Sequence, residues 1–226
     1  MKPFLSTLLA GAAALTASLA AADPLGAPQE ARFLHTRLEA LALIETLNAE
    51  LLAARSATAT LEKWCADHHM AEEPRIVAKR ADAAEKPASA ETRQRLAVRE
   101  GETVKYRRVA LVCGAQVLSE ADNWYVPGRL TQEMNRLLEE TETPFGKVVA
   151  ALHPFRRTFE AQLLWSPLPA GWEMDARPEE EADAADPPHA LIEHRALLYG
   201  GDQRPFSEVD EIYTSGVLEF QRARAK

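Results

Sequence analysis

Two adjacent arginines, Arg107 and Arg108, stand in an apolar stretch over residues 104–113 whose composition is typical of a β-strand. Because side chains alternate between the two faces of a strand, Arg108 shares a face with Ala110, and Arg107 shares the other with Val109. A charge beside apolar residues on a half-buried strand needs a partner. A guanidinium binds a carboxylate through two parallel hydrogen bonds, so this pattern favours recognition of a carboxylated molecule. The alternative is an internal salt bridge or a solvated arginine at a sheet edge.

Two further positions could contribute to an anion site. The pair Thr143-Pro144 is typical of a helix start with proline at its first position. The unbonded N–H groups of such a start, here including that of Phe145, attract anions, although a plain helix start has the same sequence. Arg195 lies in the middle of an expected strand, where it could supply a second cation or form a cross-strand ion pair.

The sequence contains no motif that is typical of a metal or cofactor site. His68 and His69 are adjacent and would leave a helix in different directions, and His153, His189 and His194 have no ligand-like spacing. There is no glycine-rich phosphate loop, no Gly-x-Ser-x-Gly motif and no paired-cysteine motif. We therefore expect no metal and no cofactor.

Hydrophobic periodicity predicts the elements that position these residues. A leucine stripe predicts a helix over residues 30–54, and Ser56 is a candidate N-cap for a second helix over 57–70. Two more helices are expected over 129–140 and 143–152. The expected strands cover residues 75–79, 96–98, 104–113, 117–126, 157–165, 190–199 and 206–219. Two leading helices followed by strands with hairpin-like links indicate an α+β fold around an antiparallel sheet.

The N-terminus has the three parts of a secretory signal peptide. Lys2 precedes an apolar run, which ends in Ala20-Ala21-Ala22 before the first acidic residue, Asp23. The run is shorter and richer in alanine than a membrane-spanning helix. We expect cleavage after about residue 22, a periplasmic or secreted product, and no membrane attachment after cleavage.

The remaining residues, 23–226, have the length of a single domain with its own core. Residues 166–188 are rich in Pro, Glu, Asp and Ala, which predicts an exposed and flexible acidic loop. The formal net charge is −8, and it becomes −9 when the signal segment with its single lysine is removed. An acidic domain without a basic stripe is a poor candidate for binding nucleic acid or anionic membranes.

The sequence contains two cysteines, Cys65 and Cys113. Export would permit a disulfide between them. Two buried thiols fit the sequence equally well, because spacing alone does not show that two cysteines meet.

Five segments, in this order, resemble the chorismate pyruvate-lyase family, whose enzymes make 4-hydroxybenzoate for ubiquinone. More distantly, they resemble related ligand-binding domains of bacterial transcription regulators. The segments are LLAARSAT (51–58), YRRVALVCG (106–114), VP (126–127), TPFG (143–146) and RPFSEVDEIY (204–213). The resemblance covers roughly residues 45–220, and it implies a chorismate lyase-like α+β fold.

The resemblance also implies roles for individual residues. Arg108 would grip a substrate carboxylate, the N–H of Phe145 would donate to a carboxylate, and Glu211 would hydrogen-bond a ring hydroxyl. Counting from the preceding proline favours Asp210 instead of Glu211, and these two point to opposite faces of one strand. The expected catalytic residues are Arg108 and Glu211, and the expected substrate-binding residues are Arg108, Phe145, Arg195 and Ala57.

The activity implied is elimination of pyruvate from chorismate or a similar enolpyruvyl compound, leaving an aromatic acid. The alternative is a non-catalytic periplasmic module that binds a small aromatic or carboxylated ligand. A signal peptide favours this alternative, because chorismate is made in the cytoplasm. A third possibility is a structural or envelope-interaction protein whose pocket is filled by side chains.

Overall fold

The computed structural model describes residues 29–81, 84–174 and 186–224. The expected signal peptide and the centre of the expected acidic loop therefore lie outside the described residues. Among the described helices, none is long and apolar enough to cross a membrane.

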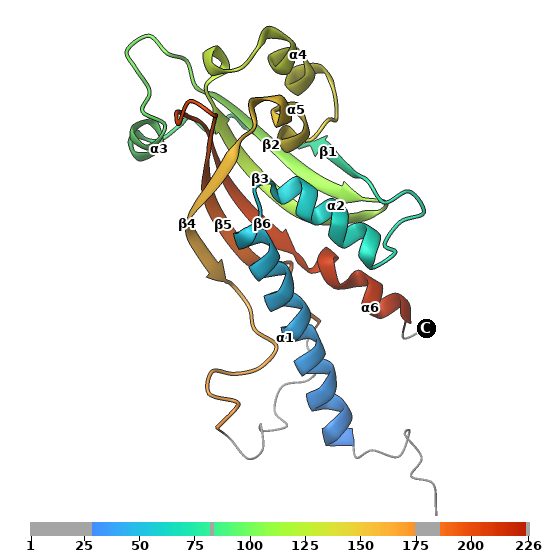
Figure 1. Ribbon diagram of the computed structural model, residues 1–226. Helices are drawn as coiled ribbons and strands as arrows, with labels where there is room; N and C mark the ends of the chain where they lie inside the picture. Colours follow the sequence, from blue (N-terminus) through green and yellow to red (C-terminus); the bar gives the residue numbers. More distant parts are fainter. Residues whose placement is uncertain (1–28, 82–83, 175–185, 225–226) are drawn as a thin grey trace, which may run out of the picture.

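Six antiparallel strands form one sheet in the order β1-β2-β3-β6-β5-β4 (Figure 1). Buried and partly exposed residues alternate from Arg107 to Leu111 in β2 and from Val209 to Tyr213 in β6, as expected for a sheet whose two faces have different environments. The strands are β1 (Ile76–Arg80), β2 (Lys105–Cys113), β3 (Gln116–Tyr125), β4 (Phe155–Leu163), β5 (Ala190–Tyr199) and β6 (Pro205–Thr214). The expected α+β fold with an antiparallel sheet is confirmed.

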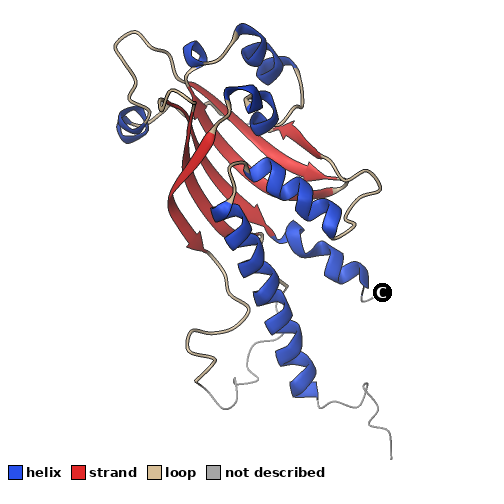
Figure 2. Cartoon of the chain, viewed as in Figure 1, coloured by secondary structure: helices blue, strands red, loops and turns tan. Residues whose placement is uncertain are grey.

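Helices cover mainly one face of this sheet, which we call the inner face (Figure 2). The first two helices begin and end close to the predicted positions, and Ser56 caps the second by accepting a hydrogen bond from the N–H of Ala59 at 3.3 Å. The α-helices are α1 (Gln29–Ala53), α2 (Ala57–Asp67), α3 (Ala90–Arg95), α4 (Gln132–Glu140), α5 (Phe145–Val148) and α6 (Glu219–Arg224). Short 3-10 turns cover Pro127–Arg129, Ala150–Leu152 and Ser215–Leu218.

The main core lies between α1, α2 and the inner face of the sheet. Ile44, Leu47 and Leu61 are completely buried there against β2 and β3. Cys65 of α2 and Cys113 of β2 form a disulfide whose Cα atoms are 6.2 Å apart. This bond fixes α2 to the sheet and answers the question that the sequence left open.

Residues 96–98 do not form the strand that the sequence predicts. Ser89 caps α3 by accepting a hydrogen bond from the N–H of Thr92, and Leu96 ends that helix. Leu96 is completely buried against Trp124 and Leu197 on the outer face of the sheet. The apolar character of this segment therefore reflects the anchoring of a short helix and not a strand.

The pairing of β2 with β3 contains a β-bulge. Leu111 pairs with Ser119 whereas Val112 pairs with Val117, so Leu118 is an extra residue in β3. Beyond the bulge, Ala121 and later alternate residues of β3 face the inner side.

Candidate functional site

A cavity lies between the inner face of the sheet and the beginnings of α2 and α5. Its volume is about 50 Å³, which is room for a few water molecules or one small group. Clefts that enclose drug-sized ligands are about 300–1,000 Å³. The lining residues are Arg55, Ser56, Ala57, Thr58, Arg107, Val109, Leu111, Ala121, Asn123, Phe145, Gly146, Pro154, Arg156, Leu198, Val209 and Glu211.

Arg107 is the most unusual group of the cavity. The residue is only 4% exposed, and its Nε, Nη1 and Nη2 atoms have no hydrogen-bond partner among the residues that the structure describes. Burial lowers the pKa of Arg107, and the nearby charge of Arg80 lowers it further. An arginine nevertheless stays protonated in a protein. The cavity therefore contains a buried positive charge that an anion would neutralise.

The N-terminus of α2 forms another wall of the cavity through Ser56, Ala57 and Thr58. The first N–H groups of a helix have no partner within that helix and carry partial positive charge. A Cβ atom on Gly146 would lie 2.9 Å from Ser56 Oγ and equally close to Thr58 Oγ1, so only glycine allows α5 this close to α2. An anion in the cavity would thus meet Arg107 and the positive end of an eleven-residue helix.

Arg156 and Glu211 form a buried ion pair at the opposite side of the cavity. Arg156 Nη2 lies 2.6 Å from Glu211 Oε2, and the side chains are 4% and 8% exposed. Tyr213 donates a hydrogen bond from its hydroxyl to the same carboxylate at 3.1 Å. Burial, followed by the charge of Glu211, raises the pKa of Tyr213. Both contacts are made by Oε2, so one oxygen of the Glu211 carboxylate is held by protein groups.

His194 extends this network toward α1. It is completely buried, and its Nε2 lies 2.8 Å from Oδ1 of Asn48, so Nε2–H donates to that oxygen. Burial and the nearby Arg156 lower its pKa to about 4. His194 is thus a neutral structural link between α1 and the strands that carry the ion pair.

Three of the expected site residues line the cavity: Ala57, Phe145 and Glu211. Glu211 points to the inner face, as favoured from the sequence, and Asp210 points to the outer face, where Asp210 Oδ2 lies 3.9 Å from Arg195 Nε. Phe145 packs against Tyr125 and Phe206, with ring centroids 5.8 and 6.2 Å away. The binding roles expected for these three residues stay predictions.

The placement of Arg108 in the pocket is wrong. Its side chain lies on the outer face, is 40% exposed, and forms ion pairs with Glu120 at 3.2 Å and Asp122 at 3.5 Å. The bulge in β3 places both carboxylates on that face. Arg107, its neighbour in the sequence, faces the cavity instead.

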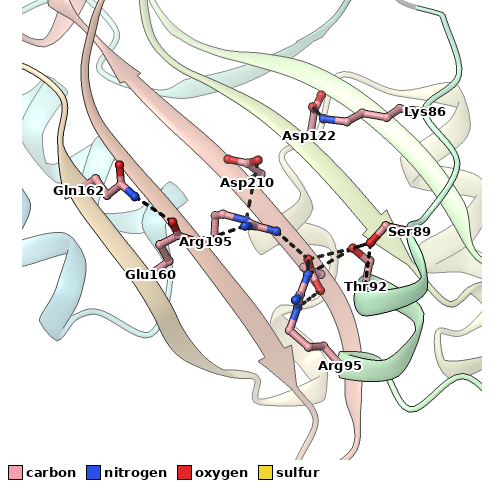
Figure 3. A network of polar contacts seen from close by, with 10 residues as sticks. Lys86, Ser89, Thr92, Arg95, Asp122, Glu160, Gln162, Arg195 and Asp210 are labelled. Carbon is pink, nitrogen blue, oxygen red and sulfur yellow. Dashed lines mark hydrogen bonds and ion pairs between the residues drawn. The ribbon is translucent and has the colours of Figure 1, made fainter.

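The placement of Arg195 as a second pocket cation is also wrong. Arg195 lies on the outer face, where it pairs with Glu160 at 3.0 Å and approaches Asp210 (Figure 3). Its guanidinium also lies 5.4 Å from the ring centroid of Phe159. Arg195 therefore forms the cross-strand ion pair that the sequence offered as the alternative to a second pocket cation.

Three arginines line the cavity, Arg55, Arg107 and Arg156, and none of them was selected as a site residue from the sequence. Alternation alone does not select Arg107, because Val109 and Leu111 share its face while Tyr106 and Val112 share the face of Arg108. Arg156 has no local signal either, since it stands at the start of an edge strand. No group of three metal-binding side chains occurs in the described part of the chain.

The fold and the cavity together define an α+β domain with a partly open, arginine-lined cavity on the helix-covered face of the sheet. No protein-family model matches the sequence. The chain is 49% identical over 187 residues to the "Uncharacterized protein y4mC" of Sinorhizobium fredii (strain NBRC 101917 / NGR234), a match that covers 82% of this chain and 79% of that protein. The chain therefore belongs to the same family as y4mC.

Solved structures show a distant likeness. PhnF from Mycobacterium smegmatis has a TM-score of 0.45 at 13% identity, with 72% of this chain and 65% of that chain covered. The possible transcriptional regulator YydK from Bacillus subtilis has a TM-score of 0.39 at 16% identity, with 61% and 58% covered. The effector-binding domain of the B. subtilis trehalose repressor has a TM-score of 0.34 at 10% identity, with 61% and 89% covered. This chain thus spans less than two thirds of the PhnF and YydK chains.

Proposed function

We propose that this protein is a binding module for a small carboxylated ligand, held in the cavity without turnover. The observation that carries the proposal is Arg107, a buried guanidinium whose three nitrogens lack partners among the described residues. A carboxylate accepts two parallel hydrogen bonds from such a group. The N-terminus of α2 would add further donors from the facing wall.

Two features favour binding over the lyase activity that the resemblance implies. Oε2 of Glu211, the expected catalytic carboxylate, is already in contact with Arg156 and Tyr213, which leaves only Oε1 for a substrate hydroxyl. The cavity, at about 50 Å³, is small for a substrate that carries a ring and two carboxylates. Conversion of chorismate to an aromatic acid and pyruvate stays a prediction.

The test is a pair of neighbouring variants, Arg107→Met and Arg108→Met. Small monocarboxylates, from acetate to 4-hydroxybenzoate, are titrated into the full chain, and the rise in melting temperature is measured. We expect a rise in the wild type and in Arg108→Met, and none in Arg107→Met. Equal responses of the two variants, or a loss confined to Arg108→Met, would contradict the proposal.

A second measurement separates binding from turnover. The wild type and Arg107→Met are incubated with chorismate, and 4-hydroxybenzoate is followed by ultraviolet absorbance. We expect no product above the uncatalysed rate. Product formation that is lost in Arg107→Met would instead support the lyase.

We also propose that the chain is exported and cleaved after about residue 22, so that the module acts in the periplasm or outside the cell. The disulfide between Cys65 and Cys113 supports this proposal, because such bonds persist mainly in oxidising compartments. Cell fractionation and the intact mass of the purified protein test it. A product that retains residues 1–22 in the cytoplasmic fraction would contradict it.

A further inference from the structure

A second hollow adjoins the cavity on the other side of Arg107. It is a groove with a volume of about 560 Å³. The ends of β1, β2 and β3 border it, together with α4 and residues 85–88. Its lining residues are Arg80, Glu85, Lys86, Pro87, Ala88, Arg93, Thr103, Val104, Lys105, Tyr106, Arg107, Tyr125, Leu138 and Glu139. Arg107 is the residue that lines both hollows.

The groove concentrates positive charge in a protein whose formal net charge is −8. Five of its lining residues are Lys or Arg and two are Glu. Lys105 pairs with Glu139, and Lys86 pairs with Asp122 outside the groove at 2.9 Å. The local excess of positive charge is therefore opposite in sign to the charge of the whole chain.

Three arginines of the groove form no ion pair within the described ranges: Arg80, Arg93 and Arg107. Lys105 and, to a smaller extent, the charge of Arg80 do lower the pKa of the Glu139 carboxyl, which lies in the same groove. Arg80 donates one hydrogen bond, from Nη1 to the backbone carbonyl of Glu139 at 2.7 Å. Arg80 and Arg107 are close enough for the charge of one to lower the pKa of the other. Two guanidinium groups placed side by side repel each other unless an anion lies between them.

We propose that the groove is a second anion subsite, in which Arg80 and Arg107 bind the distal acidic group of an elongated ligand. Its first carboxylate lies in the cavity, so this inference rests on the proposed function. A guanidinium has five N–H donors in a planar fork, which allows Arg107 to contact both acidic groups. The ligand class is a small dianion, with a carboxylate at one end and a carboxylate or phosphate at the other.

The test compares dicarboxylates of four to eight carbons with monocarboxylates of the same length. Dissociation constants are measured by calorimetry on the full chain, for the wild type and for Arg80→Gln. Because Arg80 is exposed, this substitution does not disturb the core. Arg136→Gln is the matched control, since Arg136 is an exposed arginine that pairs with Glu133 and Glu140 on its own helix.

At the carbon-chain length that binds best, we expect the dicarboxylate to bind the wild type at least about tenfold more tightly than the monocarboxylate. This difference in affinity corresponds to one additional charge-assisted hydrogen bond. In Arg80→Gln this advantage disappears, and the affinity for the monocarboxylate changes by much less than about tenfold, because a monocarboxylate in the cavity does not contact Arg80. In Arg136→Gln both affinities stay as in the wild type. A ligand with a terminal phosphonate in place of the second carboxylate shows which acidic group the subsite prefers. An increase in affinity over the monocarboxylate that depends on Arg80 supports the subsite, whether the dicarboxylate or the phosphonate shows it.

The inference is overturned if neither the dicarboxylates nor the phosphonate has an advantage over the monocarboxylate, or if the advantage survives in Arg80→Gln. In that case monocarboxylates still bind through Arg107, and the proposed function stands. The proposed function itself fails if monocarboxylates do not bind, or bind equally well to Arg107→Met. The two failures are therefore distinguishable within one set of titrations.

Discussion

Arg156 and Glu211 join the edge strand β4 to the central strand β6 through a buried ion pair of 2.6 Å, with β5 lying between the two strands. Each side chain is less than a tenth exposed. This pair anchors the edge of the sheet and closes one side of the cavity. It also occupies the carboxylate that the sequence had assigned to catalysis.

Removing one partner of this pair is expected to destabilise the fold. Glu211→Gln leaves Arg156 buried without a counter-charge, which costs about 3–5 kcal/mol in the free energy of unfolding. Urea denaturation monitored by tryptophan fluorescence measures the change. The double variant Arg156→Met/Glu211→Leu is the control and should lose much less. If both proteins lose the same free energy, the charge of Arg156 is not the cause.

Arg107→Met is expected to stabilise the ligand-free protein while it abolishes binding. The substitution replaces an unpaired buried charge by an apolar side chain of similar length, and the relief is on the order of 1–3 kcal/mol. The midpoint of urea denaturation without added anions reports this gain. A lower midpoint in Arg107→Met would mean that the guanidinium has a stabilising partner in the free protein.

The disulfide is expected to contribute substantially to stability. Cys65 and Cys113 are separated by 48 positions, and closing a loop of that size in the unfolded chain is worth about 2–4 kcal/mol. Reduction with dithiothreitol, or the double variant Cys65→Ala/Cys113→Ala, should therefore lower the melting temperature. An unchanged melting temperature after complete reduction, verified by thiol titration, would contradict this estimate.

Two buried groups give the stability opposite dependences on pH. Burial lowers the pKa of His194 to about 4 from 6.5, so its contribution to stability is complete above pH 6.5 and is lost as the pH falls toward 4. Burial and Glu193 raise the pKa of Asp210 to about 6 from 3.8, so its contribution is complete below pH 3.8 and is lost as the pH rises through 6. Between pH 4 and 6 the two effects offset each other.

Single substitutions should separate these two effects. In Asp210→Asn we expect stability to fall more steeply than in the wild type as the pH is lowered from 6.5 to 4. In His194→Gln we expect the opposite change in slope. Melting temperatures measured from pH 4 to 7 in one buffer series test both. Parallel curves for wild type and both variants would show that neither group titrates in this window.

Gly146→Ala is expected to disturb the wall of the cavity where α5 meets α2. The added methyl group would overlap Ser56 Oγ and Thr58 Oγ1, so α5 must move away from α2 at a cost of about 1–3 kcal/mol. We expect weaker ligand binding together with a lower melting temperature. Gly128→Ala is the control, because a Cβ there meets no atom within 4 Å. Equal melting temperatures for the two variants would contradict the close approach of α5 to α2.

The fold was largely predictable because its strands and leading helices have strong local signals. Three features predict the end of an element to within a few residues of the observed position: the leucine stripe of α1, the cap of α2 at Ser56 and the turn after β2 at Gly114. One exception is residues 96–98, whose apolar side chains are buried by tertiary packing of a helix end. Local pattern does not distinguish that situation from a short strand. A second exception is residues 215–219, which were expected to continue the last strand but form a 3-10 helix and the start of α6 after β6 ends at Thr214.

The candidate site was only partly predictable. Alternation shows that Arg107 and Arg108 point to opposite faces, but it does not by itself identify the face that the helices cover. Glu211 lies on the inner face, as favoured from the resemblance of its Glu-Ile-Tyr context and from the face that it shares with Val209 and Tyr213. Arg156 reaches the cavity from an edge strand that is distant in the sequence, and a single sequence contains no signal for such a contact.

The extra residue at Leu118 determines which face of the sheet the later side chains of β3 occupy. Regular pairing continued from Val112 and Val117 would place Glu120 opposite Val109 and Asp122 opposite Arg107. The two carboxylates would then lie on the inner face and would neutralise Arg107 from within the protein. A register shift of β3 that removed the bulge would therefore close the cavity to an anion without changing any residue.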